Sequence, residues 1–421
     1  MRCRIPFVVL MTSLLAVAAC GRETQTGAAP QQPSSVGEGK ATGEITVWAM
    51  GGEGENLGRL AAGFERENPG ATVKVTPVPW DGAHNKLASS IAAGQTPDVS
   101  LIGTTWMGEF AKTGALQPTP SSFDRAAFFP GLWATTEVGG TSYGVPWYAD
   151  TRSLYYRKDL AEKAGVRPPA TWDELKSFAQ ALKDKGGAAQ GINLQAGGTG
   201  AWQTFMPFGW QAGAELVDGE GKFTLDTPRM RTALEYYTSF HRSGLSSSDR
   251  LVPGAQVADF VSGKIGAFVS GAYDRSVILK QGGPEFASKY GVVELPKGER
   301  AASFAGGGDL VVFKNARNAD GAWKFIRYLS RPDVQAEWFT IQADPPAVQS
   351  AWQDPALAKD DFLQVFGRQL KVAKAPPAIP TWEQVAAVID GGIEQAARGT
   401  ASVSDVLRTM QASAASIGTG N

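Results

Sequence analysis

The chain is poor in residues that bind soft metals or form cross-links. Its 421 residues include two cysteines, Cys3 and Cys20, both near the N-terminus, and two histidines, His84 and His241. The sequence after Cys20 can therefore form no disulfide, and a zinc site would have almost no nitrogen or sulfur ligands. We expect no metal site and no cofactor, and a large hydrophobic core must stabilise the fold.

A charge excess and nucleotide-binding motifs are also lacking. The 40 Lys and Arg residues balance 41 Asp and Glu residues without forming a basic cluster, which argues against nucleic acid as a partner. There is no Walker A loop and no G-x-G-x-x-G fingerprint. A pair of carboxylates could still serve as acid and base, so a glycoside hydrolase remains the enzymatic alternative, although we expect no enzyme.

The N-terminal segment has the layout of a signal peptide. Arg2 and Arg4 precede an apolar stretch, 5–19, that is too short to span a bilayer. The following Val17-Ala18-Ala19-Cys20-Gly21 resembles the bacterial lipobox, which implies cleavage after residue 19 and a lipid on Cys20. An ordinary signal peptide is the alternative. Residues 20–43 are rich in Gly, Ala, Gln, Ser and Pro and predict a flexible, lipidated tether.

The remaining sequence predicts an α/β protein with two lobes, because it exceeds the length that one core normally serves. Residues 45–49 alternate like a strand, and Leu57, Leu60, Ala61 and Phe64 follow at helical spacing. Capping boxes at 171–174 and 381–384 and the Thr227-Pro228 pair predict further helix starts.

Several segments together resemble the extracellular solute-binding proteins of sugar ABC importers, the group that includes maltose-binding proteins. The segments are 93–99, 144–160, 290–296 and 306–314. The resemblance implies a two-lobed periplasmic-binding-protein fold (type II-like) with an interlobe cleft and hinge strands. It implies one lobe at 44–149 plus 293–343 and another at 150–292 plus 344–421.

The same resemblance implies a function. The chain would bind a mono- or oligosaccharide, maltose-like or galactoside-like, in the cleft and deliver it to the permease subunits of an ABC transporter. It would act as a monomer on the extracellular face of the cell membrane, held there through Cys20. A binding protein for another polar solute, such as glycerol phosphate or a polyamine, is the alternative within the binding class.

Sugar hydroxyls need hydrogen-bond partners and sugar C–H faces pack on aromatic rings, so acids and aromatics near the implied hinge are the candidates. Asp150 and Arg152 are the first candidates for hydrogen bonds to the sugar. The alternative is that they form a structural salt bridge at the hinge. Trp147 and Tyr148 adjoin them, and strand alternation predicts that only one of the two faces the sugar.

The resemblance implies further contacts in both lobes. Glu53 follows the first strand in a glycine-flanked loop, where a solvated acid is the alternative, and Asp81 could equally be a helix N-cap. Trp202 lies in an apparently irregular stretch, 197–210, and Trp382 could belong to the core instead. The remaining candidates are Thr105, Trp106, Tyr273, Gly307 and Asp309.

Overall fold

The computed structural model describes residues 35–249 and 255–420. The predicted signal peptide, Cys20 and most of the predicted tether lie outside the described residues. The last part of the tether segment is attached to the body: Val36 and Ala41 are buried, and the first strand starts at Thr42. Within the part of the chain that the structure describes, no helix combines the length and hydropathy needed to cross a membrane.

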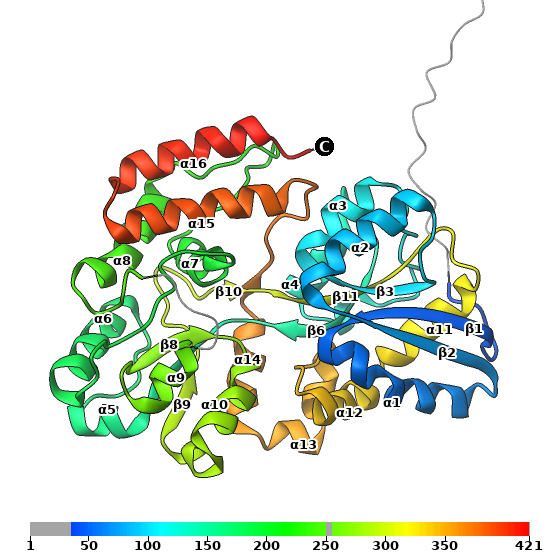
Figure 1. Cartoon of the computed structure of the whole chain (residues 1–421), viewed down its shortest axis with the longest axis horizontal. Coiled ribbons are helices and arrows are strands. Elements are labelled where there is room, and N and C mark those ends of the chain that lie inside the picture. Colours follow the sequence, from blue (N-terminus) through cyan, green and yellow to red (C-terminus); the bar gives the residue numbers. More distant parts are fainter. Residues whose placement is uncertain (1–34, 250–254, 421) are drawn as a thin grey trace, which may run out of the picture. The chain divides into compact units, whose positions relative to one another are not determined.

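The first lobe is built on a five-stranded sheet in the order β2-β1-β3-β11-β6 (Figure 1). β1 pairs in parallel with β2 and β3, whereas β11 runs antiparallel to both β3 and β6. The predicted alternation in β1 is confirmed, since Ile45, Val47 and Ala49 are buried. The strands are β1 (Thr42–Met50), β2 (Gly70–Val78), β3 (Val99–Gly103), β6 (Val145–Asp150) and β11 (Gly306–Val312).

Helices pack on this sheet through the faces that their sequences predict. Leu57, Leu60 and Phe64 are buried on α1, which packs on β2 and ends at Glu67, with Asn68 as its C-cap. The first-lobe helices are α1 (Gly51–Glu67), α2 (Trp80–Ala93), α3 (Met107–Lys112), α4 (Pro130–Trp133), α11 (Ala319–Leu329) and α12 (Pro332–Gln342). A short 3-10 turn, η1 (Thr104–Trp106), follows β3, and a small hairpin joins β4 (Glu137–Val138) to β5 (Thr141–Ser142).

The second lobe contains an antiparallel sheet in the order β8-β7-β9. Its strands are β7 (Ser153–Arg157), β8 (Ala267–Ser270) and β9 (Tyr290–Val293). Side chains alternate across β7: Tyr155 joins a core with Phe362 and Phe366, and Leu154 joins a second core on the opposite face. The helices are α5 (Lys158–Ala164), α6 (Trp172–Ala181), α7 (Ala201–Gln211), α8 (Pro228–Arg242), α9 (Ala255–Ser262), α10 (Asp274–Gly282), α15 (Trp382–Arg398) and α16 (Val403–Ile417).

Two of the three predicted helix starts have the expected caps. Thr171 and Glu174 form a complete capping box on α6, and the Thr227 hydroxyl accepts from the backbone of Met230 on α8. The predicted box at Thr381 is wrong, although α15 does begin there. The Thr381 hydroxyl donates to the carbonyl of Gly418 instead, at 2.6 Å, because the C-terminus lies against this end of the helix.

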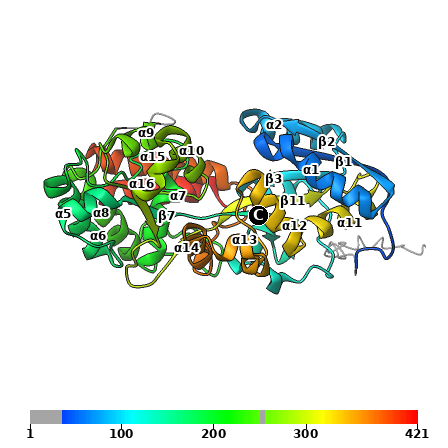
Figure 2. The same cartoon turned by 90° about the horizontal axis from the view of Figure 1, so that it is seen from below.

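The chain passes between the two sheets at several places near the middle of the body (Figures 1 and 2). β6 leads directly into β7 through Thr151 and Arg152, and β9 leads into β11 through β10 (Ser303–Phe304). β10 pairs with β12 (Ala373–Lys374), which follows α13 (Pro355–Ala358) and α14 (Asp361–Leu370). Asp150, the last residue of β6, therefore stands next to a crossing. The lobe limits at 149/150, 292/293 and 343/344 stay a prediction.

Candidate functional site

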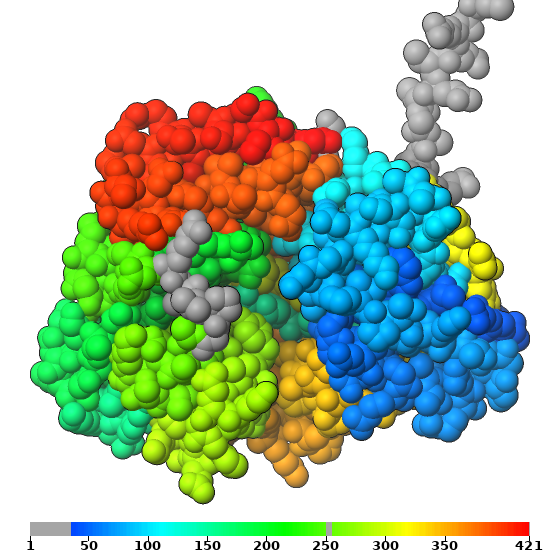
Figure 3. Space-filling view, in the orientation of Figure 1, coloured from blue at the N-terminus to red at the C-terminus, as the bar shows by residue number. Residues whose placement is uncertain are grey.

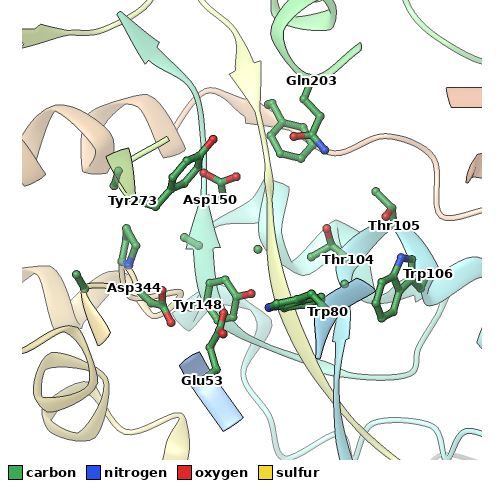
Figure 4. Close-up of a pocket in the computed structure, with 17 residues that line it drawn as sticks. Glu53, Trp80, Thr104, Thr105, Trp106, Tyr148, Asp150, Gln203, Tyr273 and Asp344 are labelled. Carbon is green, nitrogen blue, oxygen red and sulfur yellow. The ribbon is translucent and has the colours of Figure 1, made fainter. Parts of the chain in front are cut away.

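A cavity of about 400 Å³ opens where segments of both lobes meet (Figures 3 and 4). In the first lobe, the start of α1, the start of α2 and η1 follow strands β1, β2 and β3. The ends of parallel strands meet at one edge of a sheet, which places these segments together. The lining residues are Glu53, Trp80, Gly103, Thr104, Thr105, Trp106, Tyr148, Ala149, Asp150, Gln203, Ala272, Tyr273, Phe304, Gly307, Ala343, Asp344 and Pro345.

Aromatic rings line the cavity on both sides. Trp80 and Trp106 contact each other edge to face in the first lobe, with ring centroids 5.7 Å apart. Tyr273 lies in the second lobe and is 52% exposed; among the described residues it is the one large hydrophobic side chain that is exposed rather than buried or half-buried. Figure 4 shows Tyr148 between these two groups, near the floor. The cavity therefore offers flat apolar faces from two directions.

Two carboxylates, Glu53 and Asp344, lie beside Tyr148 (Figure 4). Burial raises the pKa of Glu53, although hydrogen bonds from its own backbone, Tyr148 and Trp80 act in the opposite direction. Burial, followed by the charge of Glu53, raises the pKa of Asp344 well above its usual range. The indole nitrogen of Trp338 donates to Asp344 Oδ2 at 3.1 Å and partly offsets this effect.

A third carboxylate, Asp150, is held by a buried arginine. Arg152 donates from Nη1 to Asp150 Oδ2 at 2.5 Å, and its Nη2 bonds to Gln203. Burial is the largest influence on Arg152 and lowers its pKa, but the charge and hydrogen bond of Asp150, together with Tyr273 and Asp274, raise the guanidinium pKa overall. Asp150 and Gln203 line the cavity, whereas Arg152 lies behind them. The structural salt bridge that the sequence left open is therefore present.

Seven of the thirteen predicted contact residues line the cavity: Glu53, Thr105, Trp106, Tyr148, Asp150, Tyr273 and Gly307. One detail needs correction, because Glu53 lies in the first turn of α1 and not in a loop. Gly307 has a φ of 130°, and a Cβ there would collide with the carbonyl oxygen of Tyr148. A side chain at this position is excluded by the approach of β11 to β6.

The other predicted contacts lie elsewhere. Trp147 is 1% exposed and stacks on Trp338 with centroids 4.8 Å apart, because alternation along β6 turns it away from Tyr148. Asp309 is fully buried and accepts from Thr135 at 3.0 Å. Asp81 points outward from the first turn of α2.

Two tryptophans of the second lobe belong to its core. Trp202 and Trp382 pack edge to face with centroids 4.9 Å apart. The stretch 197–210, expected to be irregular, contains helix α7 from Ala201 onward, with Pro207 inside it. Asp390 of α15 accepts from the backbone nitrogens of Gly200 and Trp202 and caps this helix from outside its own sequence. No local signal could have revealed that cap.

Sequence reasoning missed several lining residues, chiefly Trp80, Thr104, Gln203, Phe304 and Asp344. Trp80 precedes Asp81, which was a predicted sugar contact. Trp80 faces the cavity from the first turn of α2, whereas Asp81 is exposed. Gln203 is one helical position from Trp202 and is turned toward the cavity. Asp344 follows α12 in a turn whose sequence gave no periodic pattern. For Trp80, Gln203 and Asp344, the orientation of a single turn of the backbone decides whether the side chain faces the cavity.

One serine has the sequence spacing of a hydrolase nucleophile without its surroundings. Ser142 stands in Gly140-Thr141-Ser142-Tyr143-Gly144, which matches the G-x-S-x-G spacing. Its hydroxyl bonds with the hydroxyls of Thr136 at 2.8 Å and Thr119 at 3.1 Å and donates to the Gly144 carbonyl. Ser142 is buried on β5 in this hydroxyl network, so the match carries no catalytic meaning.

Comparison with known proteins agrees with this architecture. The sequence profile of the bacterial extracellular solute-binding proteins matches residues 50–336. A binding protein of Brucella abortus is 30% identical over 362 residues, covering 84% of this chain and 87% of its own. The diacetylchitobiose-binding protein DasA of Streptomyces coelicolor is 26% identical and covers 75% of this chain and 74% of its own.

A solved structure shows the same arrangement of lobes. The sugar-binding protein MalE of Xanthomonas citri superposes with a TM-score of 0.83 at 33% identity, covering 89% of this chain and 97% of the MalE chain. The matching profile spans more than half of the sequence, and the shared fold includes both lobes. The chain therefore belongs to the family of bacterial extracellular solute-binding proteins and has the two-lobed α/β fold of MalE-like binding proteins.

Proposed function

We propose that the protein binds a mono- or oligosaccharide in the cavity between its lobes and delivers it to the permease of an ABC importer. The observation that carries the proposal is the combination of aromatic faces and hydrogen-bonding groups in one cavity. Trp80, Trp106 and Tyr273 supply flat apolar faces, while Glu53 and Gln203 supply polar groups. Sugars need both, because a buried hydroxyl without a partner costs about 1–3 kcal/mol.

The arrangement suits recognition by lobe closure. Trp80 and Thr105 belong to the first lobe, whereas Gln203 and Tyr273 belong to the second. A guest that touches both groups stabilises the closed arrangement over the open one by its differential affinity, and the permease can then distinguish loaded from empty protein. The protein would act as an extracellular monomer anchored through Cys20, without catalysing a reaction.

Relatives support a carbohydrate as the guest. DasA is described as a diacetylchitobiose-binding protein, and the Xanthomonas citri MalE as a sugar-binding protein. Only the first description names an individual sugar, so the sugar of this chain has to be found by experiment.

A thermal-shift screen of the purified protein tests the proposal. The probes are glucose, galactose, maltose, trehalose, maltotriose and diacetylchitobiose, each confirmed by calorimetry. A guest that binds the native state raises the unfolding temperature by mass action. Trp80→Ala and Tyr273→Ala should weaken binding about fivefold or more each, since stacking of a flat ring on an aromatic side chain, measured for nucleic-acid bases, contributes about 1–3 kcal/mol.

Asp81→Asn is the matched control, because Asp81 adjoins Trp80 but lies outside the cavity. It should leave the affinity unchanged. Binding that survives both aromatic substitutions would place the guest elsewhere. Release of sugar products during incubation with diacetylchitobiose or maltose would contradict a purely binding role.

A further inference from the structure

The side chains that line the cavity include acidic groups but no basic group among the described residues. The lining residues that the structure describes, which exclude 250–254, contain three carboxylates, Glu53, Asp150 and Asp344, and no lysine or arginine. The nearest guanidinium, Arg152, is 6% exposed and is already engaged by Asp150 and Gln203. Its planar group also lies 5.2 Å from the ring of Phe304. Among the residues that the structure describes, a guest in this cavity would therefore meet carboxyl groups and no free cation.

The charge of Glu53 opposes the ionisation of Asp344. Burial disfavours the charged form of both groups, and the charge of Glu53 further raises the pKa of Asp344. The groups that face the pair are Tyr148 and Asp150 on β6, Trp80 on α2 and Trp338 on α12. None of these side chains is a cation, so no described group that faces the pair can neutralise an added negative charge.

We propose that Glu53 and Asp344 make the cavity selective against acidic saccharides. Uncharged sugars bind, whereas uronates and sugar phosphates are excluded by like charge. This inference rests on the proposed function and goes beyond it by naming the charge class of the guest and the residues that impose the choice. Discrimination by a repulsive element is an effective route to specificity, because juxtaposed like charges in a desolvated site are costly.

Three pairs of probes that differ in charge test the inference on the purified protein. They are glucose with glucuronate, galactose with galacturonate, and trehalose with its monophosphate, each measured by calorimetry at neutral pH. For each pair whose neutral member binds, the acidic member should bind at least about tenfold more weakly. Glucosamine and galactosamine serve as size controls. Protonated amines should not suffer the loss, since attraction replaces repulsion.

Substitution then locates the source of the discrimination. In Glu53→Gln with Asp344→Asn, the ratio of neutral to acidic affinity should fall toward one. The amides keep the shape and the hydrogen-bonding capacity of the acids while removing charge. Glu337→Gln, an exposed change outside the cavity lining on α12, the helix that carries Trp338, should leave the ratio as in the unmodified protein.

The outcomes separate this inference from the function on which it rests. Equal affinity for neutral and acidic members in the unmodified protein overturns charge selection but leaves sugar binding intact. A ratio that persists in the double variant assigns the discrimination to other groups and overturns the role of Glu53 and Asp344. Failure of every sugar probe to bind overturns the proposed function, and this inference with it.

Discussion

Trp338 joins two layers of the site, because its indole nitrogen donates to Asp344 Oδ2 at 3.1 Å while its ring stacks on Trp147. Trp147 and Trp338 are each 1% exposed, so the carboxylate at the cavity wall is positioned from within the core. The position of Asp344 therefore depends on packing that the guest never touches.

Removing that donor should weaken binding with little loss of packing. Trp338→Phe keeps an aromatic ring against Trp147 but loses the hydrogen bond to Asp344. We expect the affinity for the sugar found in the screen to fall several-fold, because Asp344 loses a hydrogen bond, and a typical hydrogen bond contributes about 0.5–1.5 kcal/mol. Trp323→Phe is the control, because it removes a comparable bond, to Gln117 at 3.0 Å, outside the cavity lining. Equal affinities in both variants would contradict a positioning role for Trp338.

Loss of Asp150 should destabilise the protein as well as weaken binding. Asp150→Ala leaves the buried guanidinium of Arg152 with Gln203 alone. Removing one partner of a buried ion pair costs about 3–5 kcal/mol, and the partial exposure of Asp150, 23% of its side chain, places the expected loss at the lower end. Arg152→Met should cost less, because Asp150 can then reach water. Urea denaturation of both variants without sugar measures the difference, and an unchanged midpoint for Asp150→Ala would show that the pair is not structural.

The buried Asp309 should make the protein less stable in alkaline solution. Burial raises the pKa of Asp309 to about 8 from 3.8, although the hydrogen bond from Thr135 acts in the opposite direction. The folded state thus holds this proton more tightly than the unfolded chain. The contribution of Asp309 to the free energy of unfolding is complete below pH 3.8 and is lost as the pH rises through about 8.

We expect this loss to be on the order of several kcal/mol. Asp309→Asn should remove it and should be more stable than the unmodified protein at alkaline pH. Denaturant unfolding at a series of pH values gives the two curves. Parallel curves would mean that Asp309 does not titrate in the folded state across this range, whereas Asp81→Asn should leave the curve unaltered because Asp81 is exposed.

Two glycine substitutions should have opposite effects. Gly307→Ala places a Cβ against the Tyr148 carbonyl at a φ of 130°, so we expect a loss of about 1–3 kcal/mol in stability and weaker sugar binding. Gly58→Ala, on the exposed side of α1 with open space around it, should raise stability by up to about 1 kcal/mol. Thermal unfolding compares them, and a neutral Gly307→Ala would show that β11 can move away from β6.

Elements with complete local signals were predictable. The capping box at Thr171 and Glu174 and the apolar face of α1 depend on residues within a few positions of each other. The box at Thr381 failed because a distant partner, Gly418, competes for the same hydroxyl. α7 was missed for a related reason, since Asp390, far along the chain, caps its N-terminus. Local rules fail where a tertiary contact supplies or removes the partner.

The α/β character could be predicted from residue patterns, and the family resemblance added the two-lobed fold and the region around Asp150. Which side chains reach the cavity depends on contacts between segments that are far apart in the chain. Tyr148 faces the cavity, whereas Trp147 packs in the core against Trp338. Arg152 lies behind Asp150, and Asp344 lies beside Glu53. The physical reason is the distance along the sequence over which each interaction acts. Hydrophobic periodicity and helix capping join residues a few positions apart, whereas the exposure and charge state of a side chain depend on segments that meet only in the folded lobes.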